Sequence, residues 1–111
     1  MRKFEQLSPG DIAISIITHG ELAYGAAKSQ YKAESQKKII ELSTILPVLP
    51  LNNDVAFHYG EIRAMLENSG KPIGNNDLWI ASHARALDLT LVTNNTKEFK
   101  RISHLKLENW V

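Results

Sequence analysis

The sequence contains no cysteine, so it can form neither a disulfide, nor a thiolate nucleophile, nor a Cys-ligated zinc site. This absence favours a reducing compartment, and we expect a cytoplasmic protein. Long apolar runs are also missing. None approaches the roughly 20 residues that a membrane-spanning helix needs, and the first residues lack the apolar core of a signal peptide. We therefore expect no contact with a membrane.

Neither sign of charge is in clear excess, because the chain has 13 basic and 12 acidic residues. A contact with nucleic acid would therefore depend on a local basic cluster, such as Lys97, Lys100 and Arg101, and not on the field of the whole chain. A solvated surface is the alternative for this cluster. A glycine-rich phosphate loop is absent as well, which argues against an unrelated α/β phosphate-binding protein.

Amphipathic helices alternate with short apolar strands along the sequence. Its 111 residues are enough for one domain with one core, residues 1–111. Strands are expected at residues 12–17, 48–51, 89–93 and 105–110, and helices at residues 19–28, 33–46, 53–69, 77–87 and 96–102. This alternation predicts an α/β sandwich with a largely parallel sheet.

Capping residues and apolar stripes define the predicted helices. Thr18 is the expected cap of the helix that begins at His19. Asn52 or Asn53 is expected to cap the longest helix, which should close at Gly70. Two helices carry apolar stripes that should face the core. These are Val55, Tyr59, Ile62 and Leu66 on the first, and Ile80, Ala84 and Leu87 on the second.

Two carboxylates, Glu21 and Asp77, lie at the starts of helices that are predicted to join strands. Functional groups of parallel sheets gather at the carboxyl ends of the strands, so the two acids could share a divalent metal. Structural explanations are also available. Asp77 could serve only as a helix cap, and Glu21 could serve only to complement the helix dipole.

Three segments carry a resemblance to a known family: ISIITHGELAYGAAKS, PIGNNDLWIASHARALDLTLVTNNTKEF and LENW. In their order and separation they resemble the VapC-type toxins of the PIN-domain ribonucleases. The resemblance covers nearly the whole chain. It implies a PIN-like three-layer sandwich and an endoribonuclease that depends on Mg²⁺ or Mn²⁺. It also implies a cognate antitoxin as partner, an RNA substrate, for which initiator tRNA is the analogy, and a homodimer.

The resemblance also implies roles for individual residues. Glu21 and Asp77 would bind the metal directly or through water, and Thr93 and Asn95 would hydrogen-bond the attacking water or a neighbouring carboxylate. Members of the family open with a strand that ends in L-D-T-N, and its aspartate is a further ligand. Since that strand is not found here, the central strand of the sheet is expected to be absent, and the alternative is an inactive toxin that keeps only its antitoxin-binding or dimerisation surfaces.

Three aromatic residues and the four histidines could have either structural or functional roles. Tyr24, Tyr59 and Trp79 could stack on nucleobases, but their helical spacing favours burial in the core or in a dimer interface. The four histidines form no ligand pair at helical spacing, and a surface position or core packing is expected for each.

Overall fold

The computed structural model describes residues 3–5, 12–93 and 95–109 of the chain. Its strands are β1 (Lys3–Glu5), β2 (Ile12–Ser15), β3 (Val48–Leu49), β4 (Thr90–Val92) and β5 (Leu107–Glu108). Its helices are α1 (Ile16–Lys28), α2 (Lys32–Ile45), α3 (Asn53–Asn68), α4 (Asn75–Ala86) and α5 (Thr96–Phe99). The predicted alternation of helices and strands is confirmed from residue 12 onward.

The strands form one sheet in the order β3-β2-β1-β4-β5. The strand β2 is parallel to β3, and β4 is parallel to β5. Because β1 is antiparallel to both β2 and β4, these two strands run in the same direction. All strands except β1 therefore end at one edge of the sheet, as a largely parallel sheet requires, and chain segments that follow them meet there.

The centre of the sheet differs from the expectation. We expected the central strand to be absent, but β1 lies between β2 and β4, where Phe4 is opposite Ala13 on one side and Leu91 on the other. It is not the parallel opening strand that the resemblance implies, because its direction is reversed. An extended segment in this place supplies hydrogen-bonding groups to both neighbours, which would otherwise present open edges.

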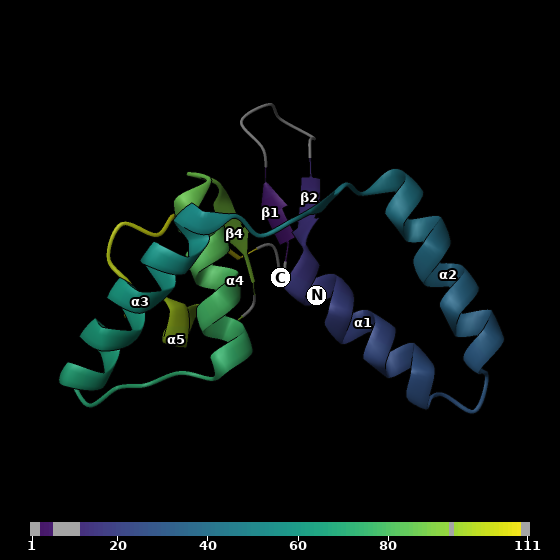
Figure 1. Ribbon diagram of the computed structural model, residues 1–111, viewed down its shortest axis with the longest axis horizontal. Helices are drawn as coiled ribbons and strands as arrows, with labels where there is room; N and C mark the ends of the chain where they lie inside the picture. Colours follow the sequence, from purple (N-terminus) through teal and green to yellow (C-terminus); the bar gives the residue numbers. More distant parts are fainter. Residues whose placement is uncertain (1–2, 6–11, 94, 110–111) are drawn as a thin grey trace.

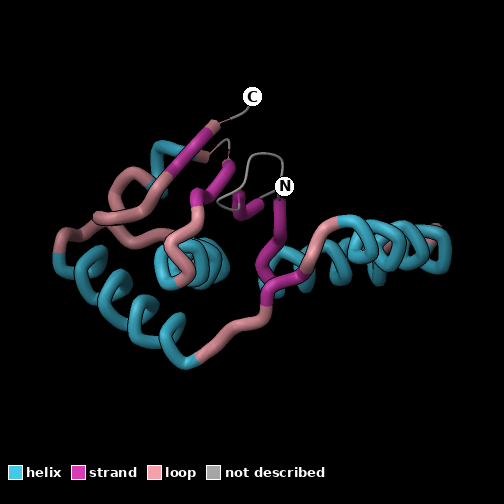
Figure 2. The backbone as a smooth tube through the Cα atoms, turned by 90° about the horizontal axis from the view of Figure 1, so that it is seen from above, coloured by secondary structure: helices cyan, strands magenta, loops and turns pink. Residues whose placement is uncertain are grey.

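The helices lie on the two sides of this sheet. Helices α3 and α4 pack together on one side, and the α1–α2 pair extends away on the other (Figures 1 and 2). The main core lies on the α3–α4 side. It contains Ile62, Leu66, Leu78, Ile80, Ala81, Ala84, Leu89, Leu91, Phe99 and Ile102. By contrast, α2 has no buried residue, so this helix adds little to the core.

Most of the predicted apolar stripe positions are confirmed. Val55, Ile62 and Leu66 of α3 are buried, and so are Ile80 and Ala84 of α4. The prediction for Leu87 is wrong, since its side chain is 36% exposed. The reason is that α4 ends at Ala86, so Leu87 follows the helix and no longer shares the direction of its inner face.

Two predicted helix starts are wrong, and both corrections affect the site. Ser15, not Thr18, caps α1, and its hydroxyl accepts a hydrogen bond from the backbone N–H of Ile17. Gly74, not Asp77, is the cap residue of α4. The other predicted signals are confirmed. Asn52 caps α3 by accepting from Val55 N at 3.2 Å, and the chain turns after this helix at Gly70, with φ +70°.

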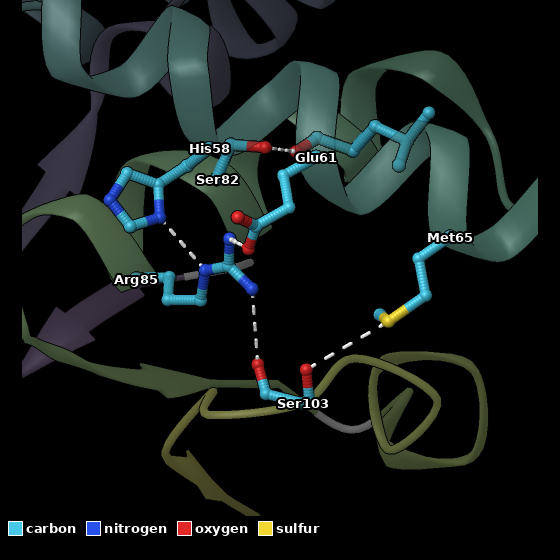
Figure 3. A network of polar contacts seen from close by, with 7 residues as sticks. His58, Glu61, Met65, Ser82, Arg85 and Ser103 are labelled. Carbon is cyan, nitrogen blue, oxygen red and sulfur yellow. Dashed lines mark hydrogen bonds and ion pairs between the residues drawn. The ribbon is translucent and has the colours of Figure 1, made fainter.

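An arginine with a largely buried side chain links α3, α4 and the C-terminal segment to one another (Figure 3). Arg85 of α4 donates to Nδ1 of His58 at 2.8 Å, to a carboxylate oxygen of Glu61 and to the backbone oxygen of Ser103. Its side chain is only 7% exposed, whereas that of Glu61 is 73% exposed. This network explains how a charged residue is accommodated beside the core, and it accounts for His58 as a structural residue.

Within the part of the chain that the structure describes, none of the helices combines the length and the apolar character needed to cross a bilayer.

Candidate metal centre between helices α1 and α4

Glu21 lies on α1 and faces a cavity of about 320 Å³. The other lining residues are Ile16, Ile17, Gly20, Tyr24 and Asn76. Because α1 begins at Ile16, Glu21 is in the second turn of the helix, and the first turn contains no acidic residue. The helix dipole acts mainly on the first turn, so it does not account for Glu21. The structural explanation of this residue is therefore weakened, and its position on the cavity wall favours a functional one.

Asp77 is the third residue of α4 and is half-buried. Its neighbour Asn76 lines the same cavity as Glu21, and α1 contacts α4. Thus the two helices that carry the predicted ligands approach each other at this cavity. Asp77 is not the cap residue, but the helix N-terminus still favours its negative charge.

A buried hydrogen bond joins the two acid-bearing helices. The Ser15 hydroxyl, next to α1, lies 2.8 Å from Nδ1 of His83 on α4, and both residues are buried. Burial lowers the pKa of His83, and a backbone hydrogen bond with Pro50 opposes this effect. A neutral His83 can accept a hydrogen bond from the Ser15 hydroxyl at Nδ1. The pair therefore fixes α1 against α4, six residues from each carboxylate.

Neither Ser15 nor His83 was predicted to belong to the site. The burial of His83 agrees with its predicted packing. Ser15 was predicted to lie inside a strand that continues to Ile17, but it is the last residue of β2 and caps α1. A signal was available, since serine directly before Ile16 is a preferred helix cap. The partner of Ser15 could not be found in the same way, because it lies 68 residues away in the sequence.

Thr93 and Asn95 follow β4, at the same edge of the sheet from which α1 begins. Thr93 is buried, and its hydroxyl accepts a hydrogen bond of 3.0 Å from the backbone N–H of Asn95. Asn95 is half-buried, and its side chain makes no capping hydrogen bond to α5. Thr93 thus holds the turn that presents Asn95. Their action on the water or on a carboxylate stays a prediction.

The donor atoms suit a hard divalent cation. Among the described residues, no group of three or more His, Cys, Asp or Glu side chains is arranged to hold a metal ion. A pair of carboxylates nevertheless fits Mg²⁺, which commonly uses one or two protein carboxylates and completes its coordination with waters and substrate phosphate. The set lacks the nitrogen or sulfur ligands of a typical zinc site.

The aromatic residues differ in what they can contact. Tyr59 and Trp79 stack on each other with ring centroids 3.9 Å apart, so the predicted structural role is confirmed for them. Tyr24 is not part of the core of this chain, because it is 65% exposed, and its burial in a dimer stays a prediction. All three residues of the basic cluster are exposed: Lys97, Lys100 and Arg101. The cluster lies on and just after α5, at the carboxyl end of β4.

Residues 2–105 match the family model of the PIN domain. The chain is 52% identical over 99 residues to ribonuclease VapC2 of Rickettsia felis, covering 89% of this chain and 74% of the relative. The chain belongs to the VapC-type ribonucleases of the PIN-domain family. Another VapC relative, the tRNA(fMet)-specific endonuclease of Shigella flexneri, is 41% identical over 110 residues, which are 99% of this chain and 83% of the relative.

A solved structure agrees with the VapC-type fold. The VapBC-1 structure from nontypeable Haemophilus influenzae has a TM-score of 0.89 and 43% identity, and the match covers 95% of this chain and 79% of the other. The predicted PIN-like α/β fold is thereby confirmed. Since the relatives are named ribonucleases, the nuclease interpretation is favoured over the inactive-module alternative.

Proposed function

We propose that this VapC-type PIN-domain chain cuts RNA with the help of Mg²⁺ or Mn²⁺ held between Glu21 and Asp77. The observation that carries the proposal is the cavity itself. Glu21 and Asn76, the neighbour of Asp77, lie on its wall although they come from different helices. The contact between α1 and α4 supports the proposal, because it brings the residue next to Asp77 to the same opening as Glu21 although the two lie far apart in the sequence.

The chain's own residues have definite tasks in this proposal. A divalent ion lowers the pKa of a bound water and polarises a phosphoryl oxygen. Glu21 and Asp77 would hold the ion through hard, anionic oxygens, and would leave its other positions to water and phosphate. Asn95 would orient the water, and Thr93 would hold the turn that carries Asn95. Ser15 and His83 would keep the two acid-bearing helices in place.

The relatives guide the choice of substrate and partner. We infer that the chain is the toxin of a toxin–antitoxin pair, since VapC relatives are solved as VapBC complexes. The Shigella flexneri relative is named a tRNA(fMet)-specific endonuclease, so initiator tRNA is the first substrate to try. The absence of cysteine agrees with a reducing cytoplasm, where this RNA occurs. A homodimer is the expected assembly.

The test is RNA cleavage by the purified chain with Mg²⁺ or Mn²⁺, using initiator tRNA and an elongator tRNA. Glu21→Gln and Asp77→Asn should each reduce cleavage on the order of 100-fold or more, since a metal site supplies several kcal/mol of transition-state stabilisation. Asp54→Asn is the matched control, because Asp54 is an exposed acid in the first turn of α3. Equal activity in Asp77→Asn and Asp54→Asn would reject the proposed site.

A further inference from the structure

Tyr24 is placed at the cavity in a way that the proposed cleavage reaction does not use. It lies one helical turn after Glu21, lines the same cavity, and is 65% exposed. A tyrosine that packed only within its own chain would hide its ring, as Tyr59 does by stacking on Trp79. An exposed aromatic ring beside a site for phosphate chemistry instead resembles the stacking surfaces on which proteins hold single-stranded RNA.

A basic side chain completes the arrangement. Nζ of Lys28 lies 5.0 Å from the centroid of the Tyr24 ring, within the range of a cation–π contact. This contact places a positive charge one helical turn beyond Tyr24, next to its ring. The same charge can attract the RNA backbone next to a stacked base.

The spacing of Glu21 and Tyr24 suits one nucleotide. Residues three apart on a helix have Cβ atoms about 5–6 Å apart. A phosphate and the base of the same nucleotide are separated by a similar distance. A phosphate at the metal held by Glu21 would therefore bring an adjoining unpaired base to the ring of Tyr24.

We propose that Tyr24, supported by Lys28, is a stacking site for an unpaired nucleobase next to the phosphate that is cut. The proposal rests on the proposed function, because the phosphate position is that of the metal between Glu21 and Asp77. It assigns the ring to substrate binding and not to the chemical step. Unpaired loop nucleotides are the substrate class, since a base in a duplex cannot expose its face to the ring.

The experiment measures binding without cleavage. A short single-stranded RNA that contains 2-aminopurine is titrated with the full chain in EDTA, and fluorescence quenching reports stacking of the probe base. Tyr24→Phe should bind and quench like the original chain, because the ring is retained. Tyr24→Ala should lose the quenching and raise Kd roughly five- to a hundredfold. Tyr31→Ala is the matched control, since Tyr31 follows α1 on the same helical pair and is 63% exposed, but does not line the cavity.

Three results would overturn the inference. The first is unchanged quenching and Kd in Tyr24→Ala. The second is an equal loss in Tyr24→Ala and Tyr31→Ala, which would show a general effect on the helical pair. The third is normal RNA binding by Tyr24→Ala with loss of the antitoxin complex, which would assign the ring to a protein partner.

The binding result is separable from the proposed function. Metal and cleavage are not needed for quenching, so a Tyr24-dependent signal would stand even if the chain cut no RNA. In the opposite case, normal cleavage with no Tyr24 dependence would reject the stacking site and leave the metal site intact. For an active chain, Tyr24→Ala should raise KM and leave kcat nearly unchanged.

Discussion

Removal of the Ser15 hydroxyl tests how firmly α1 is fixed to α4. Ser15→Ala deletes the cap of α1, which is worth about 1 kcal/mol, and it takes the hydroxyl away from Nδ1 of the buried His83. Loss of a partner by a buried polar atom costs about 1–3 kcal/mol. The free energy of unfolding should therefore fall by about 2–4 kcal/mol, a large part of the roughly 5–15 kcal/mol typical of a domain.

Asn52→Ala provides the matched control for this prediction. Asn52 caps α3 with one hydrogen bond to Val55 N, and it is exposed. Its loss should cost only the capping contribution of about 1 kcal/mol. Urea unfolding followed by circular dichroism gives both values, provided that the slope against urea is unchanged. If Ser15→Ala costs no more than Asn52→Ala, the buried pair does not fasten the two helices, and the reasoning fails.

Two further predictions concern buried polar groups of the same region. Because burial lowers the pKa of His83, the neutral residue stabilises the fold at high pH, and this contribution should be lost as pH falls below about 6.5 toward the lowered pKa. Urea unfolding at pH values from 7.5 to 5 measures how the free energy of unfolding depends on pH. For the original chain this free energy should fall with pH by at most about 1.4 kcal/mol per pH unit through His83, and His83→Gln should lack this fall. Parallel pH profiles of the two proteins would contradict the prediction. Within the described part of the chain, the buried Oγ1 of Thr18 has no hydrogen-bond partner. Thr18→Val removes this oxygen and should raise the free energy of unfolding by about 1 kcal/mol, measured by a thermal melt. A lower melting temperature would show that the hydroxyl does have a partner.

The sequence was informative wherever a structural signal is local. Asn52 and Gly70 mark the ends of α3 because a cap and a left-handed turn are determined by neighbouring residues. The apolar spacing of Val55, Ile62 and Leu66 predicted the buried face of the same helix. Glu21 and Asp77 were identified with a possible metal site because family-like motifs surround them, and the structure places both helices at one cavity.

The errors arose where distant residues decide the conformation. In the run ISIIT, two hydroxyl residues could cap the helix, and β-branched Ile16 and Ile17 favour a strand locally. The choice of Ser15 instead of Thr18 depends on His83, far away in the sequence. The strand β1 likewise exists only through pairing with β2 and β4, and no periodicity in three residues could reveal it.

Metal binding by the two acids tests the central claim most directly. Mn²⁺ titrated into the purified chain should raise its melting temperature, since a ligand at 100 times its Kd stabilises the folded state by about 2.7 kcal/mol. Asp77→Asn and Glu21→Gln should each abolish most of this increase, whereas Asp54→Asn should retain it. An equal increase in all four proteins would contradict a metal site between Glu21 and Asp77.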